Sequence, residues 1–325
     1  MIIDVPVSSS EHDGFDVIGD VHGCYNQLVE LLHQLGYSDE SGAYRHSSRQ
    51  VVFVGDLIDR GPGQVDVLRL VRAMADAGTA LVVMGNHEFN ALAYATPNPD
   101  QPGEYLRRHS EKNNSQHAEF LAQIGGGSAD HVDVVKWFTT LPLWLDLGDL
   151  RVVHACWEPS AMTGLGTPYL DEQLLVAAST SGNDVYQWVE HLCKGPEVRL
   201  PAGHTFHDKE GNRRTEARLR WWDAKPLTYA SACEVPPNCT PPLPDTTIQD
   251  LPVDLYNHDV PVIFGHYWRD WPSIELTNTT ACVDYSAVKG GPLVAYRWSG
   301  ETTLTVEHLV AAGQRPIRWP TIHEL

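Results

Sequence analysis

Residues of the types that bind divalent metals follow five apolar segments of this chain, each just past the segment's end. The segments are residues 15–18, 51–54, 81–83, 150–153 and 260–264. The polar residues after them are Asp20 with His22, then Asp56, Asn86, His154 and His266. Carboxylate oxygen, imidazole nitrogen and amide oxygen suit Mn, Fe, Zn or Mg, and one aspartate can bridge two ions. Two metals roughly 3.5–4 Å apart stabilise both the attacking and the leaving oxygen of an in-line displacement, so the set predicts a two-metal site for phosphoryl chemistry.

Any one of these positions, taken alone, has an ordinary structural explanation. An Asp or Asn after a strand is usually a turn former or a helix cap. Five such positions, all in metal-ligand residue types, are poorly explained in that way. The five turns offer no cysteine ligand, which argues against a structural zinc site.

The apolar segments alternate with stretches of helical periodicity. Leucines recur at helical spacing over residues 28–35, and Pro62 opens a second helix with apolar residues on one side over 67–74. A further helical stretch contains Trp137 and Phe138. Continuous apolar strands alternating with helices indicate an α/β fold whose sheets are covered on their faces. Ligands collect at the carboxyl ends of strands in such folds, so the polar residues are expected to converge.

Residues 159–258 form a long interval of different character. They contain two predicted helices, residues 170–179 and 183–193, and then irregular, proline-rich sequence from 236 to 252. We interpret residues 159–258 as an insertion that covers the metal face of a single domain, residues 1–325. After it, residues 281–283, 293–296 and 303–306 are predicted to be strands that close a second sheet.

Composition restricts the functional classes. The 325 residues are 42% hydrophobic, as in a soluble globular protein, and no run of 18 apolar residues is present to span a membrane. The net charge of -19 disfavours a long nucleic acid as a partner but allows a small phosphorylated substrate. Residues 1–10 lack the basic start and apolar stretch of a signal peptide. Six cysteines without a CxxC spacing suit reduced thiols, so we expect a cytoplasmic protein.

Five short blocks, in this order, resemble the signature of the calcineurin-like metallophosphoesterase superfamily. The blocks are Asp20-Val21-His22, Gly55-Asp56-Leu57-Ile58-Asp59-Arg60-Gly61, Gly85-Asn86-His87-Glu88, His154-Ala155 and Gly265-His266. The Asp-Arg-Gly ending of the second block is similar to the phosphoprotein-phosphatase (PPP) branch. The Cys-Tyr at 24–25, Phe-Gly-His-Tyr-Trp at 264–268 and Asp-Tyr-Ser at 284–286 further resemble a bacterial subgroup. That subgroup includes asymmetric diadenosine-tetraphosphate hydrolases and the phosphatase module of RNA-repair enzymes.

The resemblance implies a role for each matching residue. It assigns the first metal to Asp20, His22 and a bridging Asp56, and the second to Asp56, Asn86, His154 and His266. It makes His87 the general acid, with Asp59 orienting its ring. Arg60 and Asn86 are implied to bind the phosphoryl group, and Arg218 and Arg220 to bind further phosphates. The implied cofactor is a pair of divalent ions, with Mn expected and Fe, Zn, Ni, Co or Mg as alternatives.

The same resemblance implies a four-layer α/β/β/α sandwich that hydrolyses phosphoesters or phosphoanhydrides by attack of a metal-activated hydroxide. The leading substrate is a dinucleoside polyphosphate such as diadenosine tetraphosphate. The alternative is a phosphomonoesterase acting on phosphoprotein (Tyr, Ser or Thr) or on RNA-end phosphates. A binding scaffold without turnover is disfavoured, because the ligands and His87 are all present.

Other residues have competing explanations. His204 follows a glycine but lacks a preceding apolar strand, so a loop or substrate-contact role is favoured over a ligand role. We expect surface positions for the three histidines of the polar helical region, His109, His117 and His131. Small packing residues are expected at Cys24 and Cys156. The run from Arg213 to Arg220 is interpreted as a solvated face or, alternatively, a second phosphate clamp. Trp221 and Trp222 are expected in the core, with stacking on a base as the alternative.

Overall fold

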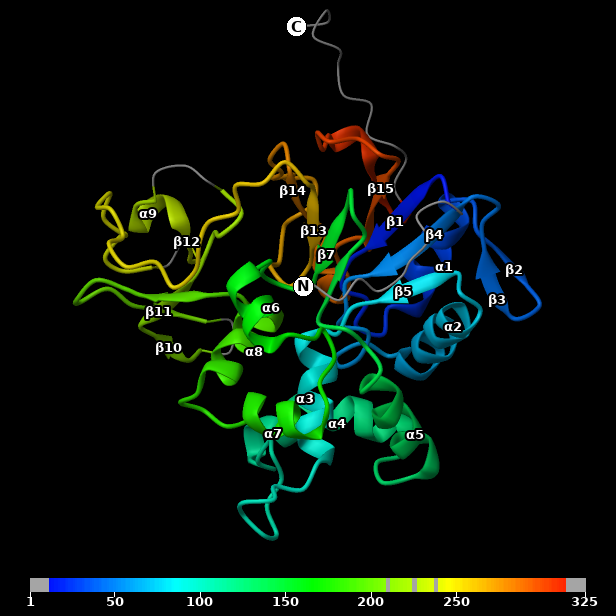
Figure 1. Ribbon diagram of the computed structural model, residues 1–325, viewed down its shortest axis with the longest axis horizontal. Helices are drawn as coiled ribbons and strands as arrows, with labels where there is room; N and C mark the ends of the chain where they lie inside the picture. The colour runs from blue at the N-terminus through cyan, green and yellow to red at the C-terminus, as the bar shows by residue number, and fades with distance from the viewer. Residues whose placement is uncertain (1–11, 209–210, 224–226, 237–238, 314–325) are drawn as a thin grey trace, which may run out of the picture.

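Two β-sheets form the centre of the protein in the computed structural model, which describes residues 12–208, 211–223, 227–236 and 239–313 (Figure 1). Residues 1–10, considered above for a signal peptide, lie outside these ranges. The first sheet has the order β16 (Leu309–Ala311), β15 (Val294–Trp298), β1 (Gly14–Ile18), β4 (Arg49–Phe53) and β5 (Ala80–Val82). The second has the order β14 (Thr280–Cys282), β13 (Val262–Phe264), β7 (Arg151–Val153) and β6 (Trp144–Asp146).

The strands that precede the predicted metal ligands run parallel to their neighbours. In the first sheet β4 lies between β1 and β5 and is parallel to both. In the second sheet β13 lies between β7 and β14 and is parallel to both. Parallel neighbours end at the same edge, so each sheet brings its polar strand ends together. All five strands expected before the ligands are confirmed, with bounds shifted by at most a few residues.

The two sheets pack face to face through one apolar cluster. Because side chains alternate along a strand, Val52 of β4 faces this cluster together with Val152 and Ile263 of the second sheet. The neighbouring Val51 and Phe53 point the other way, into a core that contains the apolar faces of two helices. These are α1 (Tyr25–Gln34) and α2 (Gln64–Asp76). The α/β class is therefore confirmed, whereas the four-layer order stays a prediction.

Three helices follow β5 and lie below the sheets in Figure 1. They are α3 (Asn86–Ala95), α4 (Glu111–Ile124) and α5 (Ala129–Phe138). Ser110 caps α4 and Ser128 caps α5, each accepting a hydrogen bond from a backbone amide of the first turn. None of the helices in the described ranges combines the length and the apolar character that a membrane crossing needs.

The segment between β7 and β13 begins with three helices and continues into small sheets at the left of Figure 1. The helices are α6 (Pro159–Leu165), α7 (Glu172–Ala178) and α8 (Asp184–Lys194). The strands are β8 (Glu197–Arg199), β9 (Phe206–His207), β10 (Arg213–Arg214), β11 (Glu216–Leu219) and β12 (Cys233–Glu234), with helix α9 (Tyr229–Ala232). Trp221 and Trp222 are buried against Phe264 of the second sheet, so their expected core role is confirmed.

The remaining short elements lie outside the two main sheets. They are β2 (Ser38–Glu40), β3 (Ala43–Arg45) and the 3₁₀ helices η1 (Ala287–Lys289) and η2 (Val306–His308). All six cysteines are free thiols, and five of them are buried.

The last part of the chain differs from its prediction. β15 joins the first sheet, not the second: it pairs antiparallel with β1, with Phe15 opposite Trp298. This pairing places Tyr296 and Trp298 in the apolar cluster between the sheets. The strand expected at 303–306 is absent from that segment, because its backbone amides bind elsewhere: the amide of Thr305 donates to the Tyr296 hydroxyl. The edge strand is instead β16.

Candidate metal centre

Three of the six predicted ligands lie in strained backbone conformations in the loops that follow the strands. His22, Asp56 and His266 have φ values of 43°, 52° and 66°, in the left-handed region that non-glycine residues rarely adopt. The glycines that precede Asn86 and His266 allow close approach of neighbouring loops: a Cβ atom on Gly85 would lie 2.3 Å from the Asp56 amide nitrogen, and one on Gly265 would lie 2.1 Å from Asp20 Oδ1. Such strain is retained where the surrounding structure requires it, commonly at functional sites.

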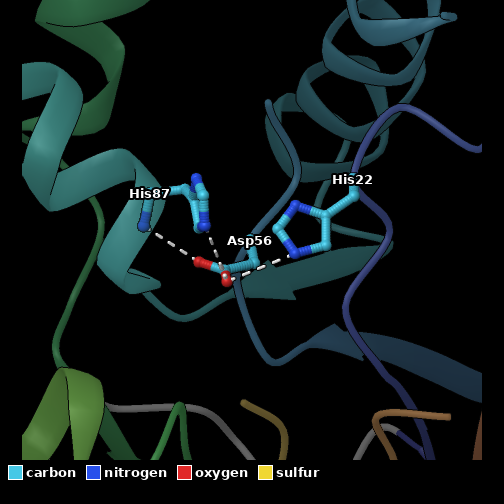
Figure 2. A group of neighbouring side chains, drawn as sticks. All are labelled: His22, Asp56 and His87. Carbon is cyan, nitrogen blue, oxygen red and sulfur yellow. Dashed lines mark hydrogen bonds and ion pairs between the residues drawn. The ribbon is translucent and has the colours of Figure 1, made fainter. Parts of the chain in front are cut away.

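Asp56 lies at the centre of the site. Its Oδ2 is 3.6 Å from His22 Nε2 and 3.8 Å from His87 Nε2, and its Oδ1 is 3.5 Å from His154 Nε2. Figure 2 shows the Asp56 carboxylate between the rings of His22 and His87. Burial alone would raise the pKa of Asp56, but the neighbouring histidines lower it to about 2. The carboxylate is therefore held ionised.

Two of the histidines are held in the tautomer that a metal ligand needs. The Nδ1 atoms of His22 and His154 donate to the backbone carbonyls of Ile58 and Val54, each at 2.8 Å. A neutral imidazole that donates from Nδ1 keeps a lone pair on Nε2, and here both Nε2 atoms face Asp56. Burial is the main cause that lowers the pKa of both rings, that of His22 to about 3, so both are neutral.

Asn86 joins the second half of the site. Its Oδ1 lies 3.1 Å from His154 Nε2 and 2.8 Å from His266 Nδ1. The Nε2 atom of His266 is buried and has no hydrogen-bond partner in the described part of the chain. Asn86 is the first residue of α3, so the strand-to-helix turn after β5 positions this side chain.

Asp20 lies beside a second carboxylate that the sequence prediction did not assign. Its two oxygens accept hydrogen bonds from the His266 amide, each at 3.2 Å. Burial, Asp284 and Asp56 together raise the pKa of Asp20 well above its ordinary value. Burial also raises the pKa of Asp284, to about 6, and its Oδ2 is buried without a partner in the described residues. Asp284 follows β14 closely, so the strand-end signal used for the other ligands could have found it.

These residues fit a pair of divalent cations. Two groups have ligand atoms that all lie within 4.8 Å of one another: His22, Asp56 and His87, and Asp56, His154 and His266. Asp56 belongs to both groups, as expected of a bridging ligand. Buried carboxylates and neutral imidazoles with inward lone pairs are groups that a cation would satisfy. The first group contains His87 where the resemblance implies Asp20, so the division of ligands between two ions stays a prediction.

His87 and Asp59 form a close pair beside Asp56. His87 Nδ1 donates to Asp59 Oδ2 at 2.5 Å, and the His87 amide donates to Asp56 Oδ1 at 3.0 Å. Burial lowers the pKa of His87, but Asp56 and Asp59 outweigh it and raise this pKa above its ordinary value. The pairing expected from the resemblance is present, and it favours the protonated imidazole that a general acid requires.

His117 also contacts Asp59, which corrects a prediction. It lies in α4 and its Nδ1 donates to Asp59 Oδ1 at 3.0 Å. The residue is only 4% exposed, and His131 is 8% exposed, so the expected surface position is wrong for both. Both lie on the inner side of their helices against Phe120. His109 is exposed as expected and stacks between Tyr94 and Tyr105.

Arg60 lies at the exposed edge of the site. Its Nη1 donates to His22 Nε2 at 2.8 Å, and its Nη2 lies 3.2 Å from His87 Nε2. The guanidinium also lies over the Trp268 ring, 5.0 Å from its centroid. Lys289 approaches the same ring, with Nζ 3.1 Å from the centroid. Neither Trp268 nor Lys289 was assigned a role from the sequence.

Glu88 shapes the turn that carries Asp56. Its carboxylate accepts hydrogen bonds from the amides of Asp56, Leu57 and Gly85, at 2.8, 2.8 and 3.0 Å. Burial and the charge of Asp56 raise the pKa of Glu88 to about 7. The sequence block that contains Glu88 was recognised, but its role in holding the neighbouring loop was not.

The two predicted arginines of β11 and its continuation have different surroundings. Arg220 is paired with Glu234 at 2.6 Å and with Glu275 at 3.2 Å. Arg218 lies over the Tyr267 ring, and its charge contributes to lowering the pKa of His154 and His266, behind burial as the main cause. Of these two arginines, Arg218 is therefore the one whose charge acts on the candidate ligands His154 and His266.

Comparisons with known proteins agree with this geometry. The family model described as calcineurin-like phosphoesterase matches residues 15–270. A protein of Halalkalibacterium halodurans named asymmetrical bis(5'-nucleosyl)-tetraphosphatase is 54% identical over 74 residues, which is 22% of this chain and 30% of that protein. An Oceanobacillus iheyensis protein of the same name is 33% identical over 141 residues, 43% of this chain and 54% of that protein. The chain thus spans about half or less of the length of these relatives.

A longer match comes from a protein of Methylobacillus flagellatus named symmetrical bis(5'-nucleosyl)-tetraphosphatase. It is 27% identical over 312 residues, 92% of this chain and 97% of that protein. Among solved structures, the cold-active protein-tyrosine phosphatase of a psychrophilic Shewanella species aligns with a TM-score of 0.51 and 16% identity, over 93% of this chain and 80% of that one. At this identity the likeness concerns the fold alone.

Proposed function

This chain belongs to the calcineurin-like phosphoesterase family, and we propose that it hydrolyses dinucleoside polyphosphates such as diadenosine tetraphosphate. The observation that carries the proposal is the shared carboxylate: Asp56 belongs to both candidate ligand groups, and the His87–Asp59 pair lies beside it. This combination suits displacement at phosphorus with proton delivery to a leaving oxygen. The names of the relatives that align with this chain support a dinucleotide as the substrate.

A dinuclear centre of divalent metals is the cofactor that this family implies. Asp20, His22, Asp56, Asn86, His154 and His266 would hold the two ions, and we propose Mn for them. Such ions activate water and stabilise negative charge on the phosphoryl oxygens. Asp284, next to Asp20, would help to balance their charge.

The protein's own side chains would carry out the remaining steps. Arg60 is the exposed cation at the site, and its planar fork of donors suits the oxygens of a phosphoryl group. Asn86 would present its amide to the same group. His87, whose Nδ1 is held by Asp59, would donate the Nε2 proton to the leaving oxygen as the bond to phosphorus breaks. Water supplies the oxygen that replaces the leaving group.

A dinucleotide needs more space than a single phosphoryl group. A cavity of about 580 Å³ is lined by Arg269, Trp271, Tyr285 and Lys289 among others. Lys289 connects it to the metal centre, because its ammonium and the Arg60 guanidinium both lie against Trp268. We propose that phosphates remote from the cleaved bond reach Lys289. The insertion, residues 159–258, would contact the substrate from another side through Arg218.

The experiment that tests the function is a substrate panel with metal-stripped protein, repeated after addition of Mn, Ni, Co, Mg or Zn. Diadenosine tetraphosphate should be cleaved with a kcat/KM well above that for p-nitrophenyl phosphate. The nucleotide products distinguish symmetrical cleavage, giving two ADP, from asymmetrical cleavage, giving ATP and AMP. A phosphotyrosine peptide or an RNA 3'-phosphate that is the better substrate by an order of magnitude would replace the proposal with the phosphomonoesterase alternative. No turnover of any substrate with any metal would favour a scaffold.

A further inference from the structure

Asp59 is held by two histidines that come from different helices. His87 of α3 donates from Nδ1 to Asp59 Oδ2, and His117 of α4 donates from Nδ1 to Asp59 Oδ1. The Asp59 carboxylate is thus occupied on both oxygens. All three side chains are buried.

The hydrogen bond to Asp59 fixes the proton on His117. An ionised carboxylate only accepts, so Nδ1 of His117 must carry the hydrogen. Its Nε2 is buried and has no partner in the described part of the chain. The ring itself packs between Tyr94 and Phe120, with centroid distances of 5.0 and 4.9 Å. The only polar contact that the structure shows for the His117 side chain is therefore with Asp59.

Asp59 needs such a partner because its backbone conformation is strained and its carboxylate is buried away from solvent. Its φ of 64° is left-handed, and its amide is held by Gln64 Oε1 at 2.8 Å. Burial would raise the pKa of its carboxyl group, but the hydrogen bonds from His117 and His87 keep this pKa below its ordinary value. Without His117, Oδ1 would be a buried acceptor with no partner, a costly state that rotation of the carboxylate would relieve.

We propose that His117 is a positioning residue for the acid step. By fixing the Asp59 carboxylate it fixes the His87 ring, whose Nε2 must point at the leaving oxygen. When the bond between phosphorus and that oxygen breaks, the bond's electron pair stays on the oxygen and the His87 Nε2 proton joins it. His117 itself never touches the substrate. The inference rests on the proposed hydrolytic function, but not on the dinucleotide as substrate.

The test compares three variants of His117, which differ in whether a hydrogen-bond donor to Asp59 remains. In His117→Asn the amide nitrogen lies near the former Nδ1 and can still donate to Asp59, whereas in His117→Gln it reaches the former Nε2 position. His117→Leu removes the donor. We expect Leu and Gln to lower kcat for phenyl phosphate by about 10-fold or more, within the roughly 10²–10⁴-fold that acid catalysis contributes. We expect Asn to restore most of this rate, with KM changed less than about two-fold.

Two further readouts separate positioning from packing. The loss should be small for p-nitrophenyl phosphate, whose leaving group departs without a proton. In a double-mutant cycle, His117→Leu should cost nothing further once His87→Asn is present, because both act through one proton transfer. Equal losses on the two aryl phosphates, additive losses in the cycle, or Gln restoring activity as well as Asn would each overturn the inference.

His131→Leu is the matched control. His131 is also a buried helical histidine packed on Phe120, but its Nδ1 accepts from the Gly127 amide and not from the catalytic pair. It should alter thermal stability without changing the ratio of rates on the two aryl phosphates. The cycle is also measured on diadenosine tetraphosphate. If that compound is not cleaved while the aryl-phosphate results hold, the dinucleotide assignment fails and the role of His117 stands.

Discussion

The Nδ1 atom of His154 donates to the carbonyl oxygen of Val54 at 2.8 Å, and this bond joins the two sheets at their functional edge. His154 follows β7 of the second sheet and Val54 follows β4 of the first. The bond therefore holds the ends of the two strands next to each other and also leaves the His154 Nε2 lone pair facing Asp56. One contact between distant parts of the chain thus fixes both the relative position of the two strand ends and the tautomer of a candidate metal ligand.

Asp56→Asn should remove most of the bound metal and abolish activity. Asparagine has the same shape but lacks the charge with which Asp56 would bind both ions. Elemental analysis of the purified variant and wild type, alongside activity assays, checks this. Unchanged metal content together with unchanged activity would rule out the bridging role.

His87→Asn should keep its metal and lose activity selectively. Because the imidazole is expected to act as an acid, the loss should be roughly 10²–10⁴-fold for poor leaving groups and much smaller for p-nitrophenolate. Rates for a series of aryl phosphates, normalised to metal content, provide the measurement. A uniform loss across the series would contradict the acid role.

Glu88→Gln should destabilise the protein. The Glu88 carboxylate accepts three backbone hydrogen bonds, and a neutral amide would turn a donor toward at least one of these N–H groups. An unsatisfied buried group costs about 1–3 kcal/mol of unfolding free energy. Urea unfolding of the metal-free protein measures this loss of unfolding free energy. Glu172→Gln, at an exposed position, is the control and should change the unfolding free energy little. Equal unfolding midpoints for the two variants would refute this role.

Lys289→Met should raise KM for diadenosine tetraphosphate several-fold and leave p-nitrophenyl phosphate nearly unaffected. The ammonium is proposed to bind phosphates remote from the cleaved bond, and the aryl phosphate has none. Steady-state kinetics on both substrates check the prediction. Lys136→Met is the control, because Lys136 lies in α5 and does not line the cavity. A proportional change on both substrates would argue for a structural role instead.

Arg218→Gln and Arg220→Gln should have different effects on KM and on stability, although the two residues are only two positions apart in the chain. The charge of Arg218 reaches the metal-centre histidines, so its loss should raise KM for the polyphosphate. Arg220 is already paired with Glu234 and Glu275, so its loss should change stability more than KM. Kinetics and thermal melting of both variants decide this, and a larger KM effect at Arg220 would reverse the assignment.

Local sequence was enough to predict which residues gather at the candidate centre. Asp20, Asp56, Asn86, His154 and His266 each follow a buried strand, and parallel strands end at a shared edge, so their convergence could be predicted without coordinates. Their residue types then indicated metal and phosphoryl chemistry. The amphipathic patterns of α1 and α2 were equally local, because one apolar face of a helix repeats every few residues.

Only the tertiary structure decided how these groups are held. His117 lies in a polar segment that predicts a surface helix, and its burial depends on where α4 packs, which local pattern does not encode. β15 joined the first sheet because it pairs with β1, about 280 residues earlier, and Arg220 was neutralised by glutamates from two other segments. Pairings between distant residues depend on the packing of the whole chain, whereas the types of residue at strand ends depend only on their immediate neighbours.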